Sequence, residues 1–188
     1  MYQTVHFYWL ANLTWLINEA LIDIERNFMI PSVFKVTKIG QGTLYVMPKP
    51  SSEWLKDDVD YLSNMGISKV VSLLEVSEEY ELGLAGERQT LEVKGIEFQN
   101  FQIKDRGIPN PVVFKELINR LYKELLEGLN IAVHCRAGIG RTGITASCLL
   151  IKDKMTSQEA IDRVSAARGV PIPDTQQQYD FICDYEVI

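Results

Sequence analysis

From about residue 31 onward, short apolar runs alternate with longer segments whose apolar residues recur every three or four positions. The short runs predict β-strands, and the longer segments predict amphipathic helices. We expect strands over 33–39, 43–47, 69–74, 96–101 and 130–134. We expect helices over 53–65, 77–94, 111–127, 142–152, 157–168 and 174–187. This alternation predicts an α/β fold with a central, mostly parallel sheet and helices on both of its faces.

Local signals refine three of these boundaries. Gly40-Gln41-Gly42 separates the first two strands and is typical of a hairpin turn. Ser51 and Ser52 precede the first helix and are good capping residues. Pro111 suits the first turn of the long helix over 111–127, because its missing N–H would have no helical partner there.

Residues 5–30 are rich in bulky apolar side chains, but polar ones interrupt them. These interruptions speak against a transmembrane helix, and the segment lacks the basic start and cleavage site of a signal peptide. The apolar residues with helical spacing favour an amphipathic helix; they are Trp9, Leu13, Leu16, Ala20 and Ile24. Three readings stay open: a helix packed on the domain, a membrane or partner contact, and an extension ahead of a natural start at Met29. We therefore divide the chain into an extension, 1–30, and a domain, 31–188.

Composition narrows the class of protein. The chain carries 19 Lys and Arg against 25 Asp and Glu, a formal net charge of −6, and 46% of its 188 residues are hydrophobic. It is too apolar for a disordered chain, and it has too few cysteines for a disulfide scaffold. An acidic balance does not favour nucleic acid as a partner. We expect a soluble, cytoplasmic globular protein.

The segment 134–143 reads His-Cys-Arg-Ala-Gly-Ile-Gly-Arg-Thr-Gly and lies between an expected strand and an expected helix. Its glycines allow a tight curl, and a curled loop at a helix N-terminus directs several N–H groups at an anion. Cys135 would lie at the base of this cradle, where the positive surroundings favour its thiolate. Arg141 follows six positions later and can grip two phosphate oxygens at once. The pattern indicates attack by sulfur on phosphorus.

Plainer interpretations of the same residues have to be weighed. A lone buried cysteine is most often a small core residue, and we interpret Cys148 and Cys183 in that way. The glycine-rich segment alone could be an ordinary turn. Its combination of histidine, cysteine, spaced glycines, arginine and a trailing Thr-Gly is more specific, and it lacks the Gly-Lys-Ser/Thr ending of nucleotide-binding loops.

The loop resembles the signature of the cysteine-dependent protein tyrosine phosphatase superfamily, and in particular its compact dual-specificity group, which includes kinase-associated phosphatases. The similarity extends over about residues 33–187, through 66–74, 157–161, 168–169 and 178–182, and leaves 1–30 uncovered. The resemblance implies a dual-specificity phosphatase fold, Cys135 as nucleophile, and no cofactor or metal. It also implies phosphate binding by the loop residues that follow Cys135, namely Arg136, Ala137, Gly138, Ile139, Gly140 and Arg141.

Asp105 is the candidate general acid. It lies in Lys-Asp-Arg-Gly-Ile-Pro, 104–109, a loop that follows an expected strand and precedes Cys135 by 30 residues. A departing alkoxide or phenoxide needs a proton, which a carboxylic acid can supply. The segment is similar to the family's Asp-x-Gly-x-Pro loop. The competing interpretation is a solvated aspartate between Lys104 and Arg106.

His134 and Gln178 are candidates for supporting roles, Thr142 is a further catalytic candidate, and Arg136 has a second possible role beside phosphate binding. The resemblance implies that His134 is structural and favours the thiolate of Cys135. Thr142 can donate its hydroxyl to the departing sulfur, or it can be an ordinary hydroxyl near the start of a helix. Gln178 matches a family glutamine near the pocket, yet Thr175-x-x-Gln178 also fits a helix capping box. Arg136 can point outward toward acidic or phosphorylated partners, or it can form a salt bridge within the domain.

These interpretations predict a phosphomonoester hydrolase that acts through a phosphocysteine, most simply a protein tyrosine or dual-specificity phosphatase. Its expected partners are a phosphorylated protein or peptide, with phosphate or vanadate as ligands of the loop. Alternatives are a phosphate-binding pseudophosphatase, a rhodanese-type sulfurtransferase, a thiol redox sensor, and a phosphatase of phosphoinositides or RNA 5′-phosphates. The only histidines are His6 and His134, so we expect no histidine metal site.

Overall fold

The computed structural model describes residues 30–185, so the helix expected within 5–30 lies outside the described residues. Apart from Ile30, the described residues belong to the second of the two units into which the chain divides, Pro31–Ile188. No helix within it is long and apolar enough to cross a membrane.

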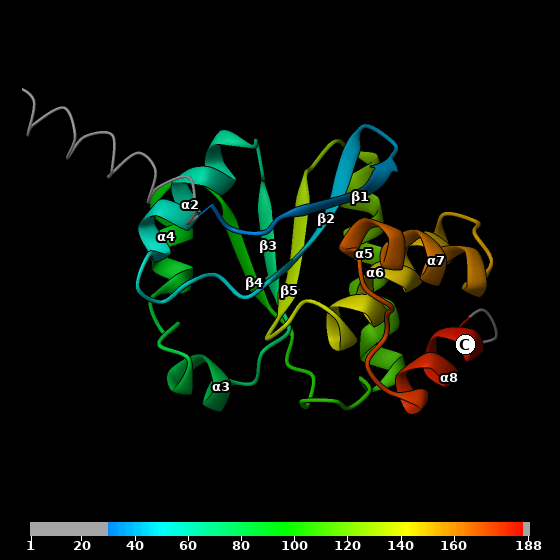
Figure 1. The fold of residues 1–188 in the computed structure, drawn as a ribbon. Helices are drawn as coiled ribbons and strands as arrows, with labels where there is room; N and C mark the ends of the chain where they lie inside the picture. The colour runs from blue at the N-terminus through cyan, green and yellow to red at the C-terminus, as the bar shows by residue number, and fades with distance from the viewer. Residues whose placement is uncertain (1–29, 186–188) are drawn as a thin grey trace, which may run out of the picture. The chain divides into compact units, whose positions relative to one another are not determined.

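In the described residues five strands form one sheet in the order β1-β2-β5-β3-β4 (Figure 1). The strands are β1 (Phe34–Ile39), β2 (Gly42–Pro48), β3 (Lys69–Ser72), β4 (Glu97–Asn100) and β5 (Ile131–Cys135). β1 pairs antiparallel with β2, and every other pairing is parallel. The expected mostly parallel sheet is confirmed, and β5 lies at its centre.

Helices cover both faces of the sheet (Figure 1). One face carries α5 (Pro111–Leu126) and α6 (Gly140–Lys152), with α7 (Ser157–Arg168) and α8 (Gln176–Asp184) packed against α6. The other face carries α2 (Leu55–Asn64) and α4 (Glu87–Val93). The short helix α3 (Val76–Glu81) follows β3, so it lies near the carboxyl ends of the parallel strands. Those ends are where open α/β sheets bind ligands.

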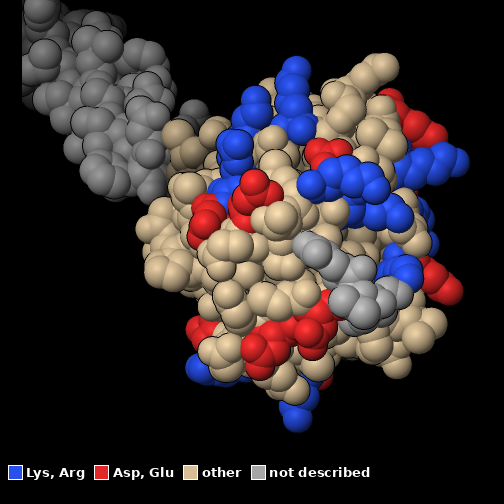
Figure 2. All heavy atoms as spheres, turned by 90° about the vertical axis from the view of Figure 1, so that its right-hand side faces the viewer, with Lys and Arg blue, Asp and Glu red and all other residues tan. Residues whose placement is uncertain are grey.

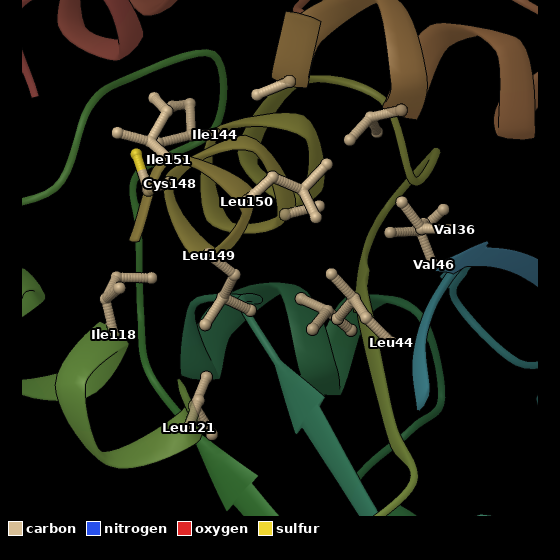
Figure 3. Packing of buried hydrophobic residues seen from close by; sticks show 14 of the residues in the cluster. Val36, Leu44, Val46, Ile118, Leu121, Ile144, Cys148, Leu149, Leu150 and Ile151 are labelled. Carbon is tan, nitrogen blue, oxygen red and sulfur yellow. The ribbon is translucent and has the colours of Figure 1, made fainter. Parts of the chain in front are cut away.

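Each face of the sheet has its own hydrophobic core. The larger core gathers residues of β1, β2, β5, α5, α6, α7 and α8, and the smaller one lies under α2 and α4. Helix α6 is central to the larger core, because every residue from Arg141 to Ile151 is buried. Figure 3 shows Leu149 of α6 directed toward Leu121 of α5, and Leu150 on the side of the strands. This packing fixes the start of α6, where the candidate loop lies.

Two expectations about helices are wrong. The segment 77–94 is not one helix but two, α3 and α4, because Gly83 adopts a left-handed φ of +69° and the chain turns inward to bury Leu84. The first helix begins at Leu55 rather than 53, with Trp54 as its N-cap and no capping bond from a side chain. Ser51 accepts instead from the N–H of Trp54, at 3.3 Å, so it supports the turn ahead of the helix.

Two other local predictions are confirmed. Gly40 and Gln41 form the hairpin turn, since Ile39 pairs with Gly42 across it. Pro111 is the first residue of α5, and the Asn110 side chain caps the helix by accepting from the N–H of Val112 at 3.0 Å.

An aromatic cluster ties α8 to the domain. The Phe114 ring of α5 lies 5.7 Å from the Phe181 ring and 6.2 Å from the Tyr185 ring, both centroid distances with edge-on geometry. Such pairs add about 0.5–1.5 kcal/mol each to the burial of the rings. They hold α8 in place, and with it Gln178, which is fully buried.

Charge is mixed over the face on which α7 and α8 lie. Figure 2 shows Lys and Arg side chains interspersed with Asp and Glu over this side of the domain.

Candidate active site

The candidate loop connects the central strand to the central helix. β5 ends at Cys135, residues 136–139 curl, and α6 begins at Gly140. The curl requires a glycine at 138, where φ is +68° and a Cβ atom would lie 2.4 Å from the carbonyl oxygen of Met47. Only a residue without a side chain lets the loop approach β2 this closely.

One pocket brings together the candidate nucleophile, the phosphate-binding residues and the candidate acid. Its lining consists of Asp105, Arg106, Cys135, Arg136, Ala137, Ile139, Gly140, Arg141, Asp174 and Gln178. Of the six loop residues predicted to bind phosphate, Gly138 alone is missing from this lining, since it lies against β2. His134 and Thr142 are fully buried and do not line the pocket either.

The start of α6 gives the pocket its backbone donors. The first turn of a helix leaves N–H groups without intrahelical partners, and these groups carry partial positive charge. Ile139 is the N-cap of α6 and provides no capping bond from its side chain. The N–H groups at this end of the helix are therefore available to an anion above Cys135.

Arg141 donates hydrogen bonds through both of its terminal amino groups. Its Nη1 donates to Glu78 Oε2 at 2.5 Å and to the carbonyl oxygen of Ile103 at 3.0 Å. Its Nη2 donates to Glu78 Oε1 at 3.0 Å and to Asp105 Oδ1 at 2.8 Å. Burial alone would lower the pKa of Arg141, but the hydrogen bonds that it donates to Glu78 and the nearby negative charges raise it above its usual value.

Glu78 is a site residue that the sequence did not reveal. It lies on α3, is buried, and forms a two-pronged pair with Arg141. Burial acts to raise the pKa of Glu78, but the hydrogen bonds from Arg141 and from the Glu75 N–H, with the charges of the two nearby arginines, together lower that pKa. Its segment contains several other acidic residues, so nothing in the pattern distinguishes it from a solvated position.

Asp105 lies on the rim of the pocket, with its side chain 55% exposed. The bond from Arg141 points its carboxylate inward, and its N–H donates to Glu75 Oε2 at 3.3 Å. A turn in which the N–H of Gly107 donates to the carbonyl of Lys104, at 2.9 Å, shapes this loop. The interpretation as a solvated loop aspartate between Lys104 and Arg106 therefore misses its contact with Arg141.

His134 occupies the buried side of β5. Its Nε2 lies 3.0 Å from Glu87 Oε1, and its Nδ1 lies 3.4 Å from the carbonyl oxygen of Cys135. Both side chains are shielded from solvent. The imidazole is thus fixed behind the loop rather than directed at a substrate.

Thr142 and Gln178 differ in their side-chain hydrogen bonds. The Thr142 hydroxyl is buried and has no hydrogen-bond partner within residues 30–185, so its donor is not engaged by another group of the domain. Thr175 does cap α8, accepting from the N–H of Gln178. The Gln178 side chain does not complete a capping box: its Nε2 donates to the carbonyl of Gly107 at 3.0 Å, and its Oε1 accepts from the N–H of Asp174 at 3.2 Å. It thereby links the acid loop to the segment ahead of α8.

Two further arginines surround the loop. Arg136 forms salt bridges within the domain, to Glu78 at 3.4 Å and to Glu81 at 3.1 Å. Arg168, whose role the sequence did not reveal, donates to the carbonyl oxygens of Gly138 and Ala137, both at 2.9 Å. Burial lowers the pKa of Arg168, and the charge of the nearby Cys135 acts in the opposite sense. Arg168 therefore braces the loop from outside the pocket.

All three cysteines are unpaired. Cys148 lies within the core on α6 (Figure 3), and burial raises its pKa well above the usual value. This placement fits the interpretation of Cys148 as a core residue.

The fold, the cysteine loop, the braced arginine and the adjacent acid define a phosphatase of the cysteine-dependent type. The chain belongs to the DSP-PTPase family: residues 35–179 match the family described as "Swiss Army Knife protein, DSP-PTPase phosphatase domain".

Curated relatives carry related names. The chain is 32% identical over 136 residues to "Protein tyrosine phosphatase domain-containing protein 1" of Mus musculus, an overlap of 66% of this chain and 18% of that protein. It is 26% identical over 133 residues to "Cyclin-dependent kinase inhibitor 3" of Rattus norvegicus, with 70% of this chain and 63% of that one covered. The chain thus spans less than two thirds of the length of these relatives.

A solved structure of a kinase-associated phosphatase, with its catalytic-site cysteine replaced by serine, superposes with a TM-score of 0.76. The two chains are 20% identical, and the match covers 84% of this chain and 95% of the other. At this identity the likeness establishes the fold, and it agrees with the sheet order and helical layers described above.

Proposed function

We propose that this chain hydrolyses phosphomonoesters on proteins through a phosphocysteine intermediate. The observation that carries the proposal is the Arg141–Asp105 contact in the pocket that Cys135 lines, because it joins phosphate binding, proton transfer and the nucleophile. Each of these functions is required for phosphoryl transfer from a stable ester without a cofactor.

In the first step the Cys135 thiolate attacks phosphorus. The bond between phosphorus and the ester oxygen breaks, and that oxygen takes a proton from Asp105. The product is a phosphocysteine and the free alcohol or phenol. In the second step a water attacks the phosphocysteine and gives a proton to Asp105, the phosphorus–sulfur bond breaks, and phosphate leaves. The unpartnered Thr142 hydroxyl would donate to the sulfur as its charge returns.

The N–H groups at the start of α6 and the Arg141 guanidinium would stabilise the equatorial phosphate oxygens. Arg141 also contacts Asp105, so we propose that a bound phosphate takes over Arg141 donors while Glu78 keeps the guanidinium in place. Inorganic phosphate and vanadate would occupy the same loop.

Phosphorylated proteins or peptides are the proposed substrates, with phosphotyrosine and phosphoserine or phosphothreonine both admitted. The names of the curated relatives support this class. We propose action in the cytoplasm, a reducing compartment that suits three unpaired cysteines.

The test is a phosphatase assay on the purified chain with an aryl phosphate, matched phosphotyrosine and phosphothreonine peptides, a phosphoinositide and an RNA 5′-phosphate. We expect turnover of the aryl phosphate and the peptides that vanadate inhibits and a metal chelator leaves unchanged. Binding without turnover of any substrate would favour the pseudophosphatase, and faster turnover of the lipid or RNA would overturn the protein substrate.

A further inference from the structure

Arg106 has a backbone conformation that its residue type disfavours. Its φ is +57°, and it is the third residue of the turn that the N–H of Gly107 closes onto the carbonyl of Lys104. A positive φ at this place in a turn favours glycine, and a residue with a Cβ atom is strained there. Backbone strain of this kind, about 1–3 kcal/mol, concentrates at functional sites. The question is what the Arg106 side chain contributes.

The Arg106 side chain lines the pocket beside Asp105. It is 66% exposed, and its closest partner is Asp174, with Nε and Oδ2 3.8 Å apart. This pair is too long for a hydrogen bond and is weak at such exposure. Within residues 30–185 the two terminal amino groups of Arg106 are therefore open to a ligand.

The other two arginines that line the pocket already form hydrogen bonds with acidic side chains of the domain, and Arg141 has the scissile phosphate as its proposed ligand. Arg141 is bonded to Glu78 and Asp105, and Arg136 is bonded to Glu78 and Glu81. The scissile phosphate already has Arg141 and the N–H groups of the loop. A further open guanidinium at the rim is therefore surplus to the reaction itself and suits a second anionic group of the substrate.

We propose that Arg106 selects phosphopeptides that carry an anionic group, a carboxylate or a second phosphate, on a residue next to the phosphorylated one. This inference rests on the proposed function, since it assigns a substrate class to the same pocket. The weak pair with Asp174 engages only the Nε side of Arg106, so the incoming anion binds the open terminal amino groups.

A peptide fits these observations better than a phosphoinositide. Among the described residues that line the pocket, Arg106 is the cation without a hydrogen-bonded acidic partner; this matches one additional anion, whereas a polyphosphorylated headgroup presents several. The residues that follow Arg106 also place exposed apolar side chains, Ile108, Val112 and Val113, along the same stretch of chain. Such side chains can contact the uncharged part of a peptide.

The test compares three peptides that differ only in the residue beside the phosphorylated one: alanine, aspartate or phosphoserine. For the wild-type chain we expect kcat/KM to be about tenfold higher for the two anionic peptides than for the neutral one, mainly through KM. A gain with phosphoserine alone would assign the partner of Arg106 as a phosphate, and a gain with both would assign a general anion.

Arg106→Gly removes the guanidinium and the strain together, so the chain should fold at least as well, and thermal unfolding checks this. Because Arg106 neighbours Asp105, the readout is the ratio of kcat/KM between anionic and neutral peptides, which we expect to fall to about one. Arg106→Lys should retain part of the ratio, since it keeps the charge but not the planar fork. Lys104→Ala is the matched control: it removes an exposed charge from the same loop, outside the pocket lining, and should leave the ratio unchanged.

The ratio of binding affinities between anionic and neutral peptides separates this inference from the proposed function. In a Cys135→Ser chain, titration calorimetry gives the affinities of the three peptides with and without Arg106→Gly. If the wild-type chain hydrolyses no peptide, the proposed function fails, and the binding ratio still decides the role of Arg106. Equal ratios with and without Arg106, or a phosphoinositide that binds in preference to every peptide through Arg106, would overturn the inference.

Discussion

Glu78 and Arg141 face each other beneath the pocket and share two hydrogen bonds, from Nη1 to Oε2 at 2.5 Å and from Nη2 to Oε1 at 3.0 Å. Both side chains are almost completely shielded from water. An arginine fixed in this way needs little reorganisation when a phosphate arrives, which is the condition under which charged groups stabilise a transition state most effectively. The pair links the stability of the domain to the site.

Replacing Glu78 should therefore unfold the domain more easily. In Glu78→Gln, the amide cannot neutralise Arg141, and its NH₂ group meets an Arg141 donor instead of accepting from it. We expect the free energy of unfolding in urea to fall by about 3–5 kcal/mol, the cost of breaking a buried ion pair. Glu81→Gln is the control, because Glu81 is 64% exposed and its pair with Arg136 contributes at most about 1 kcal/mol. Equal losses in the two variants would contradict the account.

The same pair predicts a pH dependence of stability. Burial acts to raise the pKa of Glu78, but the hydrogen bonds from Arg141 and the Glu75 N–H, together with the charges of Arg141 and Arg136, lower it below the usual glutamate value. A lowered pKa in the folded state means that the stabilisation is complete above the unfolded value, about 4.3, and is lost as the pH falls through the folded value. The difference in unfolding free energy between wild type and Glu78→Gln should shrink below about pH 4. Urea titrations at a series of pH values check this, and a constant difference would refute it.

Arg168 should affect the shape of the loop rather than the chemistry. Its guanidinium reaches the carbonyl oxygens of Ala137 and Gly138 and lies 4.3 Å from the centre of the Phe34 ring. Arg168→Lys keeps the charge but cannot make both bonds, so we expect about a tenfold weaker inhibition by phosphate, together with about 1–3 kcal/mol lower stability. Arg163→Lys, at an exposed position of the same helix, is the control. Unchanged phosphate inhibition in Arg168→Lys would exclude this role.

The parts of the site that the sequence predicts are those whose geometry is local. Cys135 and Arg141 belong to one strand–loop–helix connection, so their spacing alone determines that they meet. Asp105 required the resemblance to a known family, because a single aspartate on a loop is ordinary. The alternation of strands and helices likewise predicted the sheet and its layers.

The parts that the sequence did not predict depend on tertiary packing. Glu78 lies 63 residues before Arg141, in a segment with several similar acids, and only the position of α3 selects it. Arg168 is the last residue of α7, and basic residues are common at helix C-termini. Its position in the sequence therefore gave no sign of its bonds to the loop. The prediction of a single helix over 77–94 was wrong for a related reason, because burial of Leu84 favours a turn within a polar segment.

Asp105→Asn removes the proposed proton donor while it keeps the shape of the side chain and its contact with Arg141. The asparagine Oδ1 can still accept from Arg141, so the loop should keep its position. The amide cannot supply a proton, and we expect kcat to fall about 10²–10⁴-fold for substrates with poor leaving groups. The loss should be much smaller for an aryl phosphate with an acidic phenol, which departs without protonation. Steady-state kinetics with a series of aryl phosphates measures this dependence, and a uniform loss across the series would argue against Asp105 as the acid.

The most direct test of the central claim is to quench the reaction in acid during turnover of a good aryl phosphate and to locate covalent phosphate by mass spectrometry. The account predicts one phosphate on the proteolytic peptide that contains Cys135, more of it in Thr142→Ala because the second step is slowed, and none in Cys135→Ser, which should have no turnover. Sustained turnover by Cys135→Ser, or covalent phosphate on a different residue, would contradict it.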